Sequence, residues 1–239
     1  EPSRNHLPSL MQHSKRAVAG FGTFRQHPKG HDIGDLFEGH MAFGHLLPDR
    51  IGVFLAPGID MDWQAIEGYD RNAASRLPHA WQAGAQTALL RRQLQAMDDG
   101  GLVIISVPDN PYRCPPGPYE RISMVAHVLK QKNPTAKILV LDPKEKYSKQ
   151  ALFEEGWARH YDGMVEWVGP DFGGAAMEVR ADTMEVVVEG EAQKVDVCNV
   201  IPGQVAGKIA ALAGVTDDSG WAPVHPDTMK SKMDENIWV

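Results

Sequence analysis

The sequence predicts an α/β fold in which a parallel sheet is interrupted by a run of antiparallel strands. Two continuous apolar segments, 102–107 and 137–142, have the composition of strands that are buried on both faces of a parallel sheet. The amphipathic segment 119–133 lies between them and completes a strand–helix–strand unit of about 40 residues. Short strand-like segments at 164–168, 176–180 and 184–190 then predict the antiparallel part.

Two further elements are expected before this unit. Residues 51–60 predict a short buried strand that ends in a turn at Pro57 and Gly58. A helix is expected within 76–101, because five residues recur there at helical spacing: Ala83, Thr87, Leu90, Leu94 and Met97. Gly100 and Gly101 would end this helix.

The second half of the chain supplies four more elements. Segment 147–161 predicts a helix with Ser148 as its N-cap, and segment 194–202 predicts a strand that buries Cys198 in the core. Segment 205–214 predicts a short helix, and the final residues 235–239 form an apolar, strand-like run. We expect such a run to pair with another strand, as it would in the interior of a longer protein.

Composition narrows the class of protein. The chain has 239 residues, which suffices for one large domain or two modest ones. Its net charge of -7 argues against a nucleic-acid-binding or anionic-membrane surface. No apolar run approaches the roughly 18 residues of a membrane span. Two cysteines, Cys114 and Cys198, cannot build a disulfide framework.

Residues 1–50 show no clear periodicity of either kind. They hold six of the ten histidines: His6, His13, His27, His31, His40 and His45. No cysteine accompanies them, and we predict no metal site. The stretch AGFGTFR approaches the nucleotide-binding pattern GxGxxG but lacks its third glycine, so it predicts nothing about phosphate binding.

The stretch PYRCPPGPYER, residues 111–121, raises the question of whether Cys114 is a reactive thiol. Thiolate is the reactive form, and it is favoured by the neighbouring Arg113 and by a helix that opens near Pro118. The prolines restrict the loop and would hold the sulfur in place. The alternative is a small apolar side chain in a rigid loop, since cysteines are commonly buried.

Several segments together resemble one family of flavoproteins. From about residue 53 to the end, the chain is similar to the flavoprotein subunit of flavocytochrome c sulfide dehydrogenase, through APGID, LPHAWQAGAQTALLRRQL, YRCPPGPYERISMVAHVLK, YSKQALFEEGW and VIPGQVAGKIAALAGVTDDSGWAPV. The resemblance implies a flavoprotein fold with two dinucleotide-binding, Rossmann-like domains. The broader group includes the sulfide:quinone oxidoreductases.

The resemblance also implies how the chain is divided. Residues 1–75 would be the first portion of an FAD-binding domain, 76–200 a second Rossmann-like domain, and 201–239 a return towards the FAD-binding domain. On this interpretation the chain is truncated at both ends. Residues 3–50 do not resemble the family, which indicates either a local frameshift in the source sequence or a divergent insertion.

The activity implied by the family is oxidation of sulfide at a redox-active cysteine pair, with electrons passing through FAD to a c-type cytochrome subunit in the periplasm. Cys114 matches the first cysteine of that pair, and its partner would lie beyond Val239. Glu1 matches the acidic ligand of the FAD ribose, although an exposed terminal carboxylate is the alternative. Ala56, Pro57 and Gly58 match a turn close to the flavin nucleotide.

Two alternatives to this function stay open at the level of sequence. The first is a sulfide:quinone oxidoreductase that passes electrons to a membrane quinone. The second is an inactive fragment that binds neither FAD nor a cytochrome. We expect the 239 residues alone not to retain FAD, because no complete glycine fingerprint and no second redox cysteine lie within them.

Overall fold

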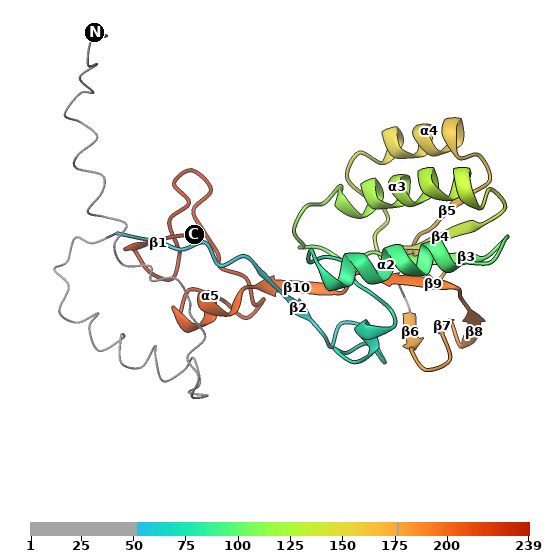
Figure 1. Cartoon of the computed structure of the whole chain (residues 1–239). Helices are drawn as coiled ribbons and strands as arrows, with labels where there is room; N and C mark the ends of the chain where they lie inside the picture. The colour runs from blue at the N-terminus through green and yellow to red at the C-terminus, as the bar shows by residue number, and fades with distance from the viewer. Residues whose placement is uncertain (1–51, 176) are drawn as a thin grey trace, which may run out of the picture. The chain divides into compact units, whose positions relative to one another are not determined.

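The computed structural model describes residues 52–239 except residue 176, and its centre is a four-stranded parallel sheet (Figure 1). The strands lie in the order β5–β4–β3–β9, and every neighbouring pair is parallel. Their bounds are β3 Leu102–Ser106, β4 Lys137–Leu141, β5 Val165–Val168 and β9 Val197–Val200. The α/β class is confirmed, but the expectation that 164–168 pairs antiparallel was wrong.

Three helices cover one face of this sheet: α2 (Ala85–Ala96), α3 (Gly117–Lys132) and α4 (Gln150–His160) (Figure 1). Alternate residues of β3, Val103 and Ile105, point into the core beneath these helices. The predicted apolar face of α3 is buried there as Ile122, Val125, Ala126 and Leu129. The strand–helix–strand unit therefore has the architecture that its hydrophobic pattern predicts.

The opposite face of the sheet carries a three-stranded antiparallel sheet, β6–β7–β8. Its strands are β6 (Met177–Arg180), β7 (Glu185–Val188) and β8 (Glu191–Lys194). Ile104 of β3 and Cys198 of β9 pack with Val186 of β7 in a second core cluster. The prediction that Cys198 is a core residue is confirmed, because none of its surface is exposed.

The segment predicted as one strand over 51–60 forms two short strands, β1 (Val53–Phe54) and β2 (Ile59–Asp62). A turn separates them, and Gly58 adopts a φ of 66°, which favours glycine. Strand β2 pairs antiparallel with β10 (Gly203–Ala206), which leads through Gly207 into α5 (Lys208–Leu212). The final apolar run does pair, since β11 (Ile237–Trp238) lies parallel to β1.

Helix starts differ from the sequence-based expectations. Helix α2 begins only at Ala85, because Gly84 has a φ of 102° and turns the chain out of helical geometry. Helix α4 begins at Gln150 after Lys149, a left-handed residue with a φ of 63°, and no side chain caps it. Ser148 is therefore not an N-cap. Short 3₁₀ turns occupy Ala73–Ser75 and Pro170–Phe172.

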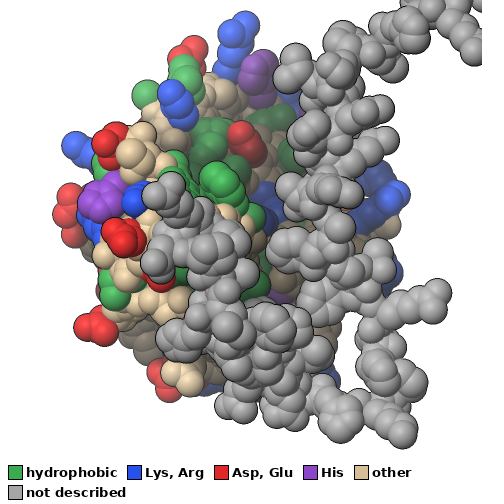
Figure 2. Space-filling view, turned by 90° about the vertical axis from the view of Figure 1, so that its left-hand side faces the viewer, with side chains coloured by type: hydrophobic (Ala, Val, Ile, Leu, Met, Phe, Trp, Pro, Cys, Tyr) green, Lys and Arg blue, Asp and Glu red, His purple; other side chains and the backbone are tan. Residues whose placement is uncertain are grey.

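Three features of the described residues bear on partners: surface charge, helices that could span a membrane, and groups of metal ligands. Acidic, basic and apolar side chains are mixed on the part of the face that Figure 2 shows in colour. No helix in the described part of the chain is both long and apolar enough to cross a membrane. Within residues 52–239, apart from 176, no cluster of three or more His, Cys, Asp or Glu is placed to hold a metal ion.

Candidate functional site

Cys114 lies in the loop that leads from β3 to α3, at the carboxyl edge of the parallel sheet. This is the edge at which open α/β sheets bind ligands. Cys114 is exposed, and its φ of 62° places it in the left-handed region, which is uncommon for a residue with a side chain. Its carbonyl oxygen accepts a hydrogen bond of 2.8 Å from the amide of Gly117 at the start of the helix.

Contacts on both sides of the thiol hold this loop in place. The Tyr112 hydroxyl donates to the carbonyl of Pro115 at 2.8 Å, and the Arg113 amide donates to the Gln204 side-chain oxygen at 2.9 Å. The Lys144 ammonium lies 5.2 Å from the centre of the Tyr112 ring and donates to the carbonyl of Pro108 at 2.7 Å. The rigid loop expected from the prolines is thus also bonded to residues distant in sequence.

Lys144 belongs to a buried ion pair beneath the loop, which sequence reasoning missed. Its Nζ lies 2.7 Å from Oδ1 of Asp142, and their side chains are 6% and 0% exposed. Oδ2 of Asp142 accepts a 2.6 Å hydrogen bond from Tyr119 and a 3.1 Å bond from Trp167. Burial, followed by the hydrogen bond to Asp142, raises the pKa of Tyr119 well above its ordinary value.

The arginines that flank Cys114 are used to anchor a neighbouring segment, 78–81. Arg121 donates to the carbonyls of His79 at 2.9 Å and Ala80 at 2.6 Å, and to Oδ1 of Asn199 at 3.2 Å. Arg113 donates to the carbonyl of Trp81 at 3.4 Å. Sequence reasoning placed Arg113 beside the thiol and gave Arg121 no role, because bonds to backbone carbonyls leave no pattern in the sequence.

Trp81 is brought next to the cysteine by this anchoring. A side chain at Gly117 would meet both the Trp81 ring at 3.0 Å and the Cys114 sulfur at 3.1 Å, so the three residues surround one small space. His79 supports the arrangement by accepting a hydrogen bond from the Trp81 amide at Nδ1, 2.9 Å away. Burial, followed by the nearby Arg121 charge, lowers the pKa of His79 below 6.5 and keeps the ring neutral.

A cavity of about 540 Å³ opens on the other side of the loop, lined in part by Asn110, Pro111, Ser106 and Gln204. Strand order reverses here, because β4 lies on one side of β3 and β9 on the other. Ligands of doubly wound sheets bind at such a switch point, and the volume suits a small molecule or a cofactor ring.

Gln204 is the residue of this cavity with unused hydrogen-bonding capacity. Only 5% of its surface is exposed, and its Nε2 has no partner among the described residues. The backbone N–H of Arg113 can bond only to the amide oxygen of Gln204, so Nε2 is the atom left as a donor. A buried donor without an acceptor costs about 1–3 kcal/mol, which a ligand with a carbonyl oxygen would recover.

The same loop offers no cradle for phosphate groups. Pro116 and Pro118 carry no N–H, and the amides of Gly117, Tyr119 and Glu120 already bond to carbonyls of the loop. Asp62 and Asp109 also line the cavity and would repel an anion. The described residues therefore fit the uncharged ring of a flavin, which has carbonyl acceptors, and do not fit its pyrophosphate.

The residues predicted to contact the flavin lie in different parts of the chain. Glu1 lies outside the described residues. Ala56, Pro57 and Gly58 form the turn between β1 and β2, but they are not among the residues that line the 540 Å³ cavity, and neither is Cys114 itself. The turn packs against Gly207, where a side chain would lie 2.0 Å from the carbonyl oxygen of Pro57. Their contact with the flavin nucleotide stays a prediction, and so do the expected domain boundaries.

One family model matches part of the chain. Residues 87–202 match the family model described as the central part of the sulfide dehydrogenase [flavocytochrome c] flavoprotein chain. This segment is therefore similar to the central domain of that flavoprotein family. The matched segment includes the whole Cys114 loop, Arg121, the buried ion pair and β9.

Two solved structures are similar to the chain at low sequence identity. A chain in the structure of the Tetrahymena thermophila mitochondrial ATP synthase is 19% identical, with a TM-score of 0.50, over 78% of this chain and 48% of that one. An NAD-dependent persulfide reductase from A. fulgidus is 16% identical, with a TM-score of 0.47, over 77% and 32%. The chain thus spans at most about half the length of these proteins.

Proposed function

We propose that the whole protein is a flavin-dependent sulfide dehydrogenase in which Cys114 is a redox-active sulfur. The observation that carries this proposal is the position of Cys114: it is exposed, it is held in a left-handed conformation, and it follows Arg113, whose amide bonds to the side-chain oxygen of Gln204. The match to a sulfide dehydrogenase flavoprotein model over this loop supports the same assignment.

The proposed reaction begins with Cys114 joined in a disulfide to a second cysteine of the whole protein. Cys198 does not serve as that cysteine, because it is fully buried in the sheet. Hydrosulfide attacks Sγ of Cys114, a new S–S bond forms, and the partner cysteine leaves as a thiolate. Joining the outer sulfur on Cys114 to the partner thiolate in a trisulfide would release two electrons and one proton, and a flavin, when it is bound, would supply the two-electron acceptor for this step.

The chain's own residues would orient this reaction. The bonds from Tyr112 and Gly117 hold the loop that carries the sulfur, and Gln204 would donate from Nε2 to a carbonyl oxygen of the flavin ring. Trp81 would form one apolar side of the space next to the sulfur. Nothing in this arrangement requires a metal ion.

The acceptor and location follow from the family rather than from the site. The family description names flavocytochrome c, which favours a c-type cytochrome subunit over a membrane quinone. We propose a periplasmic location from the family resemblance alone. We further propose that the 239-residue chain alone does not retain FAD, because the loop at Cys114 and the start of α3 supply no phosphate cradle. A purified chain that is yellow with equimolar flavin would contradict this part of the proposal.

Mixing the whole protein with sulfide under anaerobic conditions tests the main proposal. The flavin absorbance should decrease in the unaltered protein, and Cys114→Ser should slow this decrease by roughly three orders of magnitude or more, because the covalent step is lost. Cys198→Ala is the matched control and should leave the rate unchanged. Equal rates in the Cys114→Ser variant and the unaltered protein would show that sulfide reaches the flavin without this sulfur.

A further inference from the structure

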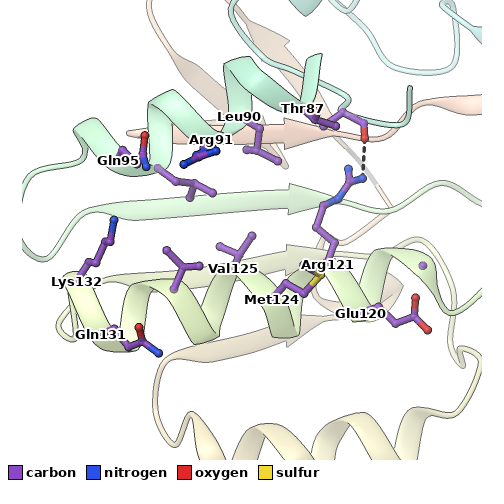
Figure 3. A pocket seen from close by; sticks show the side chains of 14 residues that line it. Thr87, Leu90, Arg91, Gln95, Glu120, Arg121, Met124, Val125, Gln131 and Lys132 are labelled. Atoms are coloured by element: carbon purple, nitrogen blue, oxygen red, sulfur yellow. Dashed lines mark hydrogen bonds between the residues drawn. The ribbon is translucent and has the colours of Figure 1, made fainter. Parts of the chain in front are cut away.

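A second hollow lies between helices α2 and α3, on the face of the sheet that these helices cover (Figure 3). It has a volume of about 650 Å³, and its floor consists of Leu90, Leu94, Val125 and Val128. Met124 is 71% exposed and Val128 is 38% exposed, although both are apolar. Figure 3 shows Leu90 and Val125 facing one another across this space. We call this space the α2–α3 groove.

The charges around the α2–α3 groove differ from those of the rest of the chain. Three basic residues, Arg91, Arg121 and Lys132, and one carboxylate, Glu120, line the groove. The whole chain has a net charge of -7. Arg91 and Lys132 line the groove, and neither forms an ion pair with another described residue.

The shape and chemistry of the groove match one kind of occupant. Two helices with an apolar strip between them form the surface into which an amphipathic helix packs. Helix α3 has 16 residues and so extends for roughly 24 Å, enough to lie along about four turns of a partner. The free cations at its rim favour a partner whose polar face is acidic.

We propose that the α2–α3 groove is a docking surface for an amphipathic helix with an acidic polar face, supplied by a partner protein. The apolar side of that helix covers Met124 and Val128, and its carboxylates pair with Arg91 and Lys132. Methionine suits such a surface, because its flexible side chain adapts to the shape of the helix that covers it. This inference does not depend on the chemistry proposed for Cys114.

Binding of synthetic helical peptides to the full chain tests the proposal. The probe is a fluorescein-labelled 16-residue peptide with leucine along one face and glutamate on the other, and fluorescence anisotropy measures its dissociation constant. A second peptide has the same leucines and lysine in place of every glutamate. We expect saturable binding of the acidic peptide, at least tenfold tighter than the basic one, and weakened by added salt.

Substitutions in the groove separate this surface from others. The double variant Met124→Glu, Val128→Glu should weaken binding of the acidic peptide at least tenfold. The control Leu152→Glu alters an exposed leucine of α4, 67% exposed, and should leave binding unchanged. Three results would each overturn the proposal: the acidic peptide does not bind saturably, the two peptides bind with equal affinity, or the groove substitutions have no effect. Self-association of the chain that the groove variant abolishes would also overturn it, by identifying a second copy as the occupant.

Discussion

Replacing Lys144 with methionine should lower the free energy of unfolding of the chain by about 3–5 kcal/mol, since one partner of a buried ion pair is removed. Lys144 and Asp142 are 6% and 0% exposed at their side chains, and their charged atoms are 2.7 Å apart. Without the ammonium, the Asp142 carboxylate keeps only its hydrogen bonds from Tyr119, Trp167 and the backbone. The loop also loses the bond from Lys144 to the carbonyl of Pro108.

Urea denaturation followed by tryptophan fluorescence measures this change. Lys146→Met is the matched control, because Lys146 is exposed and two residues away, and it should change stability by less than about 0.5 kcal/mol. Adding Asp142→Asn to Lys144→Met should recover part of the loss, since the buried unpaired charge disappears. A Lys144→Met variant that loses less than about 1 kcal/mol would show that the pair does not hold the loop.

Replacing Arg121 with methionine should cost about 2–4 kcal/mol, because the carbonyls of His79 and Ala80 and the amide oxygen of Asn199 lose a charged donor. Arg121→Lys should recover only part of this, since an ammonium cannot reproduce the planar fork that reaches both carbonyls. The exposed Arg92 of α2 provides the control, and Arg92→Met should have an effect of less than about 0.5 kcal/mol.

The pKa of His79 provides a second measurement of the effect of Arg121→Met. Burial and the Arg121 charge lower its pKa below 6.5, so removing that charge should raise the pKa towards 6.5. The pKa can be followed by NMR of the imidazole protons. In the unaltered chain, the neutral buried His79 contributes stability above pH 6.5 that is lost as pH falls below 6.5. A raised His79 pKa should therefore make this loss smaller in the variant. An unchanged His79 pKa would contradict the proposed contact.

Strong hydrophobic periodicity made part of the fold predictable. Segments 102–107 and 137–142 and the helix at 119–133 were found because their apolar residues fill one core. Strand β5 was assigned the wrong direction, since its short alternation does not encode a partner. The crossover through α4 that precedes β5 determines its direction, because a strand that follows such a crossover runs parallel to the strand before it. Strand β8 was missed, as all four of its residues are exposed and none is strongly strand-forming.

Only those residues of the candidate site that lie together in one contiguous stretch of sequence were predictable. Cys114 and its prolines were visible in the sequence, whereas Arg121, Lys144 and Gln204 act on atoms distant along the chain. Gln204 bonds to Arg113, 91 residues away, and Arg121 bonds to Asn199, 78 residues away. Such partners are brought together only by the parallel sheet, which places the ends of β3, β4 and β9 at one edge.

The central claim is that sulfide is oxidised by bonding to Sγ of Cys114, and mass spectrometry of the whole protein tests it most directly. The protein is mixed anaerobically with one equivalent of sulfide, alkylated at once and digested. We predict that the peptide containing Cys114 carries one additional sulfur atom, in step with the loss of flavin absorbance, and that the Cys198 peptide carries none. Reduced flavin accompanied by a Cys114 peptide without added sulfur would contradict the account.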